Sequence, residues 1–154
     1  MIRVKGLCRL SGLPKKVVGF SKGTVVLNQL VREWSTGCKE HMAGLKIETL
    51  SWIDGGHSNG PVQPTWINDV KILDFLACDT DCKIDVRVTP YQICDKKRPW
   101  IATEERHFSN YLLRKLQTME SAYRIQRRIY FEDEKASLLN HFRVLDTLKD
   151  YPLL

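Results

Sequence analysis

The sequence predicts an α/β domain with a mixed four-stranded sheet, helices packed on that sheet, and a helical C-terminal extension. Three observations lead to this class. The apolar period changes from strand-like to helix-like and back between residues 15 and 53, which predicts a β-α-β unit. Two apolar runs at 66–77 and 82–89 are separated by a short turn, which predicts an antiparallel hairpin. From residue 103, apolar residues recur at helical spacing, which predicts a further helix.

The first unit begins with KKVVGF at 15–20, a run of β-formers bounded by Pro14. Apolar residues then recur at helical spacing over 22–42, which predicts an amphipathic helix packed on the sheet. The run LKIETLSWI at 45–53 predicts the second strand. The connection between the two strands should be a right-handed parallel crossover.

The third and fourth strands are predicted at 70–76 and 82–89, on either side of the short turn CDTD. Strict alternation is clearest in the fourth, where Ile84, Val86 and Val88 share one face and Asp85 and Arg87 share the other. Their closeness in sequence is the reason for expecting them to pair in antiparallel fashion.

Two helices are predicted after the sheet. Thr103 is a suitable N-cap, and Glu104 and Glu105 would favour the first turn. This helix should run to about residue 123 and could continue to 131, and a last helix should start in the acidic segment 132–134. The predicted organisation is a basic N-terminal arm at 1–14, the α/β domain at 15–121 and a helical extension at 122–154.

The chain of 154 residues carries a net charge of +6, and residues 1–32 contain no Asp or Glu. A basic arm without acids suits a phosphate backbone, a mitochondrial targeting segment or an ordinary solvated terminus, and these alternatives stay open. No apolar run approaches the ~20 residues of a membrane span, so no membrane-spanning helix is expected.

Five cysteines, at positions 8, 38, 78, 82 and 94, are irregularly spaced, which indicates free thiols in a reducing compartment. Cys78 and Cys82 have a spacing found in zinc sites, but a second ligand pair is missing, so neither a metal nor a cofactor is expected. A thiol enzyme needs an activated cysteine where the first strand meets its helix. That junction, 19–24, has none.

The remaining nucleophile and base candidates are also interpreted as structural. Ser21 and Thr24 are expected to cap the helix, and His57 and His107 are expected to lie at the surface or to pack. The sequence therefore predicts no catalytic residues and no enzyme.

The basic residues indicate a function more strongly than the cysteine, serine and histidine candidates do. On a helix continuing from Thr103, four arginines fall within an arc of about 80° opposite the apolar stripe, given the 3.6-residue period. Such a face could contact phosphates or could simply be solvated. The candidate RNA-binding residues are Arg3, Lys5, Arg9, Lys15, Lys16, Lys22, Lys96, Lys97, Arg98, Arg106, Arg114, Arg124, Arg127 and Arg128.

The segments KKVVGF, LKIETLSWI and VQPTW, in this order, resemble those of the thioredoxin-like proteins of the mitochondrial ribosomal large subunit over residues 15 to about 120. Relatives of that family include a thioredoxin-like accessory subunit of respiratory complex I. The resemblance implies a thioredoxin-like fold without catalysis, a location in the mitochondrial matrix, and a cis bond before Pro64.

The leading hypothesis from this resemblance is a non-catalytic structural component of the mitochondrial ribosome. It would contact ribosomal RNA and neighbouring ribosomal proteins in a large hetero-assembly, without a small-molecule substrate. The alternatives are an accessory scaffold subunit of a respiratory complex, and a divergent thiol oxidoreductase that uses Cys78 and Cys82.

Overall fold

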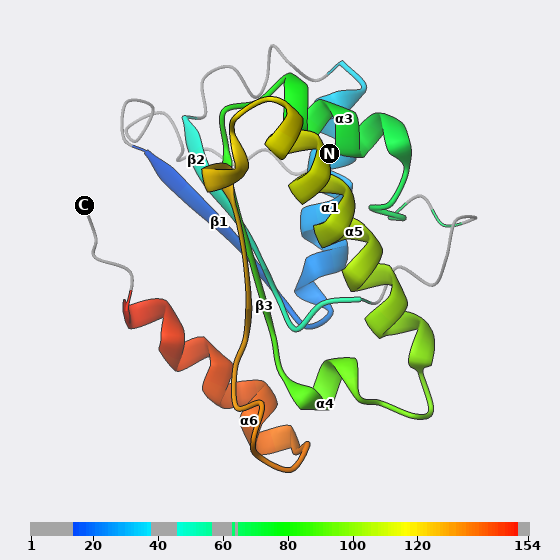
Figure 1. The fold of residues 1–154 in the computed structure, drawn as a ribbon, viewed down its shortest axis with the longest axis vertical. Coiled ribbons are helices and arrows are strands. Elements are labelled where there is room, and N and C mark those ends of the chain that lie inside the picture. The colour runs from blue at the N-terminus through cyan, green and yellow to red at the C-terminus, as the bar shows by residue number, and fades with distance from the viewer. Residues whose placement is uncertain (1–13, 38–45, 57–62, 64, 151–154) are drawn as a thin grey trace, which may run out of the picture.

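The computed structural model describes residues 14–37, 46–56, 63 and 65–150. Its centre is one four-stranded sheet of β1 (Lys15–Phe20), β2 (Ile47–Ile53), β3 (Lys83–Val88) and β4 (Ile125–Ile129), in the order β1-β2-β3-β4 (Figure 1). Every neighbouring pair is parallel. The predicted α/β class is confirmed, but the sheet is not mixed, and the thioredoxin-like arrangement is not confirmed.

The predicted third strand is a helix, α3 (Val70–Cys78). Asp69 caps it, because its carboxylate accepts a hydrogen bond from the Lys71 backbone N–H at 2.9 Å. The buried residues Ile72, Leu73, Phe75 and Leu76 form a helical stripe, but a short apolar run of this kind does not distinguish a helix from a buried strand. With a helix before it, β3 returns parallel to β2, so the predicted hairpin was wrong.

The second long helix, α5 (Pro99–Thr118), begins and ends earlier than predicted. It starts at Pro99, a residue suited to the first helical position. The Thr103 hydroxyl donates to the Pro99 carbonyl oxygen inside the helix and does not cap it. A short 3₁₀ turn, η2 (Ala122–Arg124), leads into β4. Residues 125–129 of the segment predicted as a helical extension therefore form the fourth strand, while 138–150 are helical as predicted.

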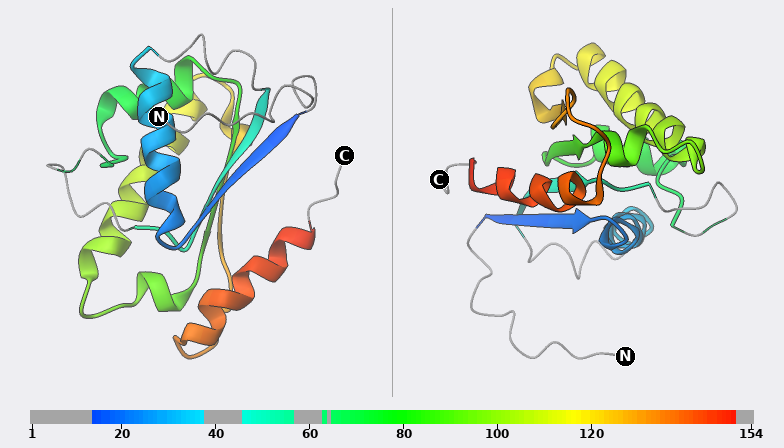
Figure 2. Two further views of the ribbon diagram at one scale, coloured as in Figure 1. Left: turned by 180° about the vertical axis from the view of Figure 1, so that it is seen from behind. Right: turned by 90° about the horizontal axis from the view of Figure 1, so that it is seen from below.

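Helices cover both faces of the sheet (Figures 1 and 2). α1 (Gly23–Ser35), α3 and α5 lie on one face, as expected when successive parallel strands are joined by crossovers of one hand. This face buries the main apolar core, which includes Val31, Leu50, Leu73 and Leu112. α6 (Leu138–Arg143) and the 3₁₀ helix η3 (Val144–Asp150) lie across the other face.

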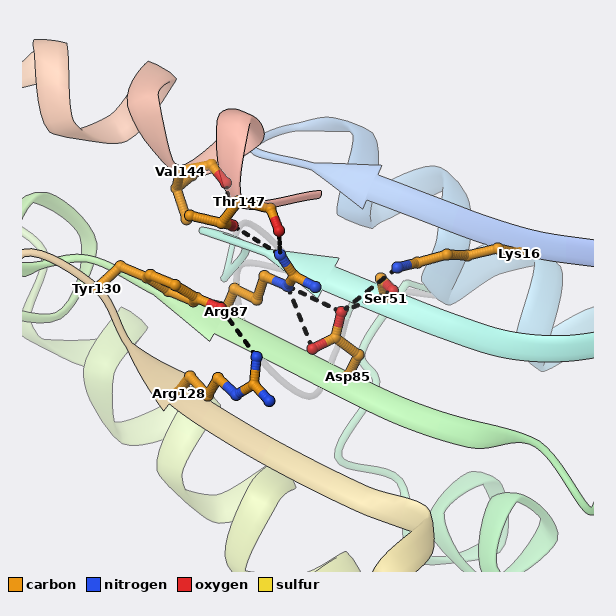
Figure 3. A network of polar contacts seen from close by, with 8 residues as sticks. All are labelled: Lys16, Ser51, Asp85, Arg87, Arg128, Tyr130, Val144 and Thr147. Carbon is orange, nitrogen blue, oxygen red and sulfur yellow. Dashed lines mark hydrogen bonds and ion pairs between the residues drawn. The ribbon is translucent and has the colours of Figure 1, made fainter. Parts of the chain in front are cut away.

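A buried polar network joins η3 to the second face of the sheet (Figure 3). Arg87, which is 0% exposed, donates from Nε to Asp85 Oδ2 at 3.0 Å and from Nη1 to the Thr147 carbonyl oxygen at 2.6 Å. Asp85 also accepts from the Ser51 hydroxyl. The predicted placement of Asp85 and Arg87 on one strand face is confirmed, and the network fixes the segment that carries His141.

None of the helices within the described ranges is both long enough and apolar enough to cross a membrane. A short helix, α4 (Pro90–Ile93), directly follows β3, and residues 94–98 connect it to α5.

Arg124 is buried and holds the end of α3. Its guanidinium donates to the carbonyl oxygens of Leu76 and Ala77 at 2.9 Å each, and to the Cys82 carbonyl oxygen at 3.3 Å. Replacing it with methionine leaves these carbonyls without that donor, so we expect the free energy of unfolding to fall by about 3 kcal/mol. Urea unfolding measures this change.

The matched control is Arg114→Met on the exposed surface of α5. Its free energy of unfolding should stay within about 0.5 kcal/mol of the wild type. Equal losses in the two variants would contradict a structural role for Arg124.

Candidate active site

Three polar residues directly follow the strands at one edge of the sheet. Ser21 follows β1, Asp54 follows β2 and Thr89 follows β3. Because all strands are parallel, their carboxyl ends meet at the edge where α4 and α6 also lie, at the lower end in Figure 1. This edge is where open α/β sheets bind ligands.

Ser21 lies on a sharp turn between β1 and α1. Its φ of 52° is in the left-handed region, which is unfavourable for a residue with a side chain. The turn is held by a hydrogen bond from the Ser21 N–H to the Ile53 carbonyl oxygen at 2.9 Å. At Gly19, an added Cβ would lie 2.9 Å from the Thr24 Cα, so the close approach of strand and helix requires glycine there.

The predicted capping by Ser21 and Thr24 was wrong. The N-cap of α1 is Lys22, and no side chain accepts a capping hydrogen bond there. Thr24 Oγ1 instead donates to the Ser21 carbonyl oxygen at 2.7 Å. The Ser21 side chain is half-buried and lines a pocket.

Asp54 is completely buried and has a φ of 45°. Its carboxylate accepts two hydrogen bonds from Thr89, from the N–H and from the hydroxyl, each at 2.6 Å. It also lies 2.8 Å from Nδ1 of His141. Burial raises the pKa of Asp54, and the hydrogen bonds from Thr89 and His141 partly offset this. The backbone and Thr89 therefore fix one carboxylate oxygen against the imidazole.

His141 comes from α6, whose first turn is capped by the Ser137 hydroxyl. The imidazole is buried between Phe20 and Tyr91, with ring centroids 4.6 and 4.9 Å away. Since Asp54 contacts Nδ1, Nε2 is the imidazole nitrogen outside this contact. His141 and Ser21 line the same pocket, which has a volume of about 280 Å³.

The three residues are of the types that make up a nucleophilic catalytic site, and Ser21 and His141 line one pocket. A serine needs an adjacent base, and the base needs a third group that orients it. The motif G-x-S-x-G spans residues 19–23 between a strand and a helix, and the chain order Ser21, Asp54, His141 is that of α/β-hydrolases. The motif was present in the sequence, but Ser21 was interpreted as a cap. No local pattern marks Asp54 or His141, which meet only in the fold.

The structure distributes the predicted RNA-binding residues over several elements. Lys15 and Lys16 lie on β1, Lys96 and Lys97 follow α4, and Arg3, Lys5 and Arg9 lie outside the described residues. The four arginines expected on one helix face are divided, since α5 ends at Thr118 and only Arg106 and Arg114 belong to it.

Several of these cations make contacts within the protein. Arg127 forms two hydrogen bonds to Glu105, at 2.8 and 2.9 Å, and this pairing raises the pKa of Arg127. Arg128 donates to the Tyr130 hydroxyl. Lys22 and Arg98 line the pocket that contains Ser21. RNA binding by these residues stays a prediction.

The described cysteines differ in burial. Cys78 and Cys94 are exposed, whereas Cys82 is buried, and burial raises the pKa of its thiol. Within the described ranges, no cluster of three or more His, Cys, Asp or Glu side chains is placed to hold a metal ion. His107 stacks on Tyr111 at the surface of α5. Cys8, Cys38, His57 and Pro64 lie outside the described residues.

Comparison with known proteins corrects the resemblance to ribosomal proteins. A family model described as C2orf69 matches residues 10–118. The chain is 38% identical over 139 residues to the mitochondrial protein C2orf69 homolog of Danio rerio, covering 88% of this chain and 38% of that protein.

Two mammalian proteins of the same name are similarly related to this chain. The mitochondrial protein C2orf69 homolog of Mus musculus is 39% identical over 88% of this chain and 35% of its own length. The human protein is 38% identical over 83% of this chain and 32% of its own length. The chain thus spans about a third of these relatives, and no solved structure matches it. It belongs to the C2orf69 family, and not to the thioredoxin-like ribosomal proteins.

Proposed function

We propose that this chain carries the catalytic residues of a serine hydrolase that cleaves carboxylic esters or thioesters. One observation supports this most directly. The buried Asp54 carboxylate lies 2.8 Å from His141 Nδ1, and His141 lines the same pocket as Ser21 on its left-handed turn. Strained backbone at a polar edge of the sheet is typical of functional sites.

The first half of the reaction transfers the acyl group to Ser21. Its Oγ attacks the carbonyl carbon while His141 Nε2 accepts the hydroxyl proton, which gives a tetrahedral intermediate. The N–H of Lys22, the residue after the nucleophile, donates to the resulting oxyanion. The C–O or C–S bond then breaks, and His141 returns the proton to the departing alcohol or thiol.

The second half removes the acyl group with water. His141 Nε2 takes a proton from water, and the hydroxide attacks the acyl carbon. The bond to Ser21 Oγ breaks, the proton passes to Oγ, and a carboxylic acid is released. Asp54 orients the imidazole in both halves and stabilises its protonated form, and Thr89 holds Asp54 in place.

We place the protein in the mitochondrion because the relatives are named mitochondrial proteins. Their names specify no reaction. The activity proposed here derives from the site, and it concerns the third of the relatives' length that this chain spans.

Covalent labelling tests the proposal. A fluorophosphonate probe should modify Ser21, because such probes react with serines activated by an adjacent base. Mass spectrometry of the labelled peptide identifies the site. Ser21→Ala should lose the label, while Ser35→Ala, at the far end of α1, should keep it. A folded protein that stays unlabelled, or is labelled at another serine, would refute the proposal.

The non-catalytic roles predicted from the sequence stay predictions. The ribosomal role no longer has a family resemblance behind it, and the respiratory scaffold drew on the same resemblance. A thiol oxidoreductase is not favoured, since the buried Cys82 has a raised pKa and a weaker tendency to form a thiolate.

A further inference from the structure

The pocket around Ser21 combines catalytic residues with positive charge. Lys22 and Arg98 both line it, together with Ser21 and His141. Among its described lining residues there is no carboxylate, and the carboxylate of Asp54 is completely buried. A substrate in this pocket therefore meets two cations and no exposed anion from the described lining.

Arg98 is held in position from outside the pocket. Its Nε donates to Asp95 Oδ2 at 2.7 Å, and Asp95 Oδ1 accepts from the Lys97 N–H at 2.8 Å. The hydrogen bond from Arg98 is the main cause of the lowered pKa of Asp95. The contact uses Nε only, so both terminal nitrogens lie outside this pair. A guanidinium anchored in this way is suited to hydrogen-bond a phosphate or carboxylate.

The same pocket has an apolar wall. Leu138 and Phe142 lie one turn apart on α6, line the pocket and are 55% and 54% exposed. Residues four apart on a helix share one face, so the two side chains form a continuous apolar surface. Large apolar side chains left exposed beside a reactive group indicate contact with an apolar part of a ligand.

We infer that the substrate is an acyl ester or thioester that has an apolar chain and bears a phosphate or carboxylate near the scissile bond. The anionic group binds Arg98 and Lys22, while the apolar chain contacts Leu138 and Phe142. This inference rests on the proposed hydrolase function and adds the class of substrate. The anion can belong to the leaving group or to the acyl group.

Competition against fluorophosphonate labelling of Ser21 tests this class, whether or not a competitor is also hydrolysed. Three butyryl thioesters differ in the charge of the thiol: coenzyme A is anionic, N-acetylcysteamine is neutral and thiocholine is cationic. A fourth competitor, the glutaryl thioester of N-acetylcysteamine, carries the anion on the acyl side. We expect at least one anionic thioester to protect Ser21 at a concentration about tenfold lower than the neutral one.

Variants link that preference to Arg98. The preference is the ratio of the protecting concentration of the neutral thioester to that of the anionic one. Arg98→Gln should reduce this ratio about tenfold, and Arg98→Lys should restore part of it. The control Lys83→Gln, at the opposite end of the sheet, should leave the ratio unchanged. Comparing the two anionic thioesters shows whether the substrate carries its charge on the leaving group or on the acyl group.

Two negative results have different meanings. If Ser21 is labelled but neither anionic thioester protects better than the neutral one, the substrate class is wrong and the hydrolase proposal stands. The substrate class also fails if the preference is the same in Arg98→Gln. If Ser21 is never labelled, the hydrolase proposal fails and this inference fails with it.

Discussion

Replacing Ser21 with alanine is expected to lower kcat for ester or thioester hydrolysis by about 10⁴-fold or more, as in other serine enzymes that lose the nucleophile. In the proposed reaction the hydroxyl oxygen forms the bond to the acyl group, and the remaining groups only bind the substrate and stabilise charge. Release of thiol from butyryl N-acetylcysteamine under saturating conditions measures kcat.

Ser21→Gly gives the matched control for folding. Glycine accepts the left-handed φ of 52° without steric cost, whereas alanine does not. The glycine variant should therefore be more stable than the alanine variant by about 1 kcal/mol in urea unfolding, although both are inactive. An alanine variant that is folded and keeps more than a tenth of the activity would show that Ser21 is not the nucleophile.

Replacing Asp54 with asparagine is expected to reduce kcat about 10⁴-fold with little change in KM. Thr89 donates from both N–H and hydroxyl, so Asp54 must accept at both oxygens. If the asparagine oxygen accepts from the Thr89 N–H, its amide N–H₂ faces His141. Nδ1 must then accept instead of donate, which moves the proton to Nε2 and removes the base.

Steady-state kinetics on the same thioester measure this effect, with Asp146→Asn as control. Asp146 is an exposed carboxylate of η3 that pairs with Lys149, and its loss should leave kcat within about twofold of the wild type. Fluorophosphonate labelling of Asp54→Asn should slow in parallel with kcat. An Asp54→Asn enzyme within tenfold of the wild type would show that Asp54 does not orient His141.

Local patterns predicted only part of the fold. β1 and β2 were predicted correctly because their apolar periods are distinct. α1 was also predicted, but it ends at Ser35, whereas the helical spacing predicted a helix over 22–42. α3 was mistaken for a strand because Val70, Ile72, Leu73 and Phe75 suit either structure in a short run. β4 was missed because it is a polar edge strand, Ile125–Ile129, whose sequence IQRRI continues the helical spacing of α5. Because β4 was taken as helix, four arginines were predicted on one helix face, whereas the structure places them on different elements.

The candidate site was likewise only partly predictable from the sequence. The sequence alone contains the motif Gly19–Gly23 at a strand-to-helix junction, and this motif carries Ser21, the proposed nucleophile. Only the tertiary structure unites Ser21, Asp54 and His141. Parallel pairing aligns the ends of β1 and β2, and the buried Arg87 network fixes the segment after β4 on the sheet. Asp54 and His141 are 87 positions apart in the sequence, yet Asp54 Oδ2 lies 2.8 Å from His141 Nδ1. A local pattern cannot specify a hydrogen bond of that range, because it depends on how the strands pair and on which face the last helix packs.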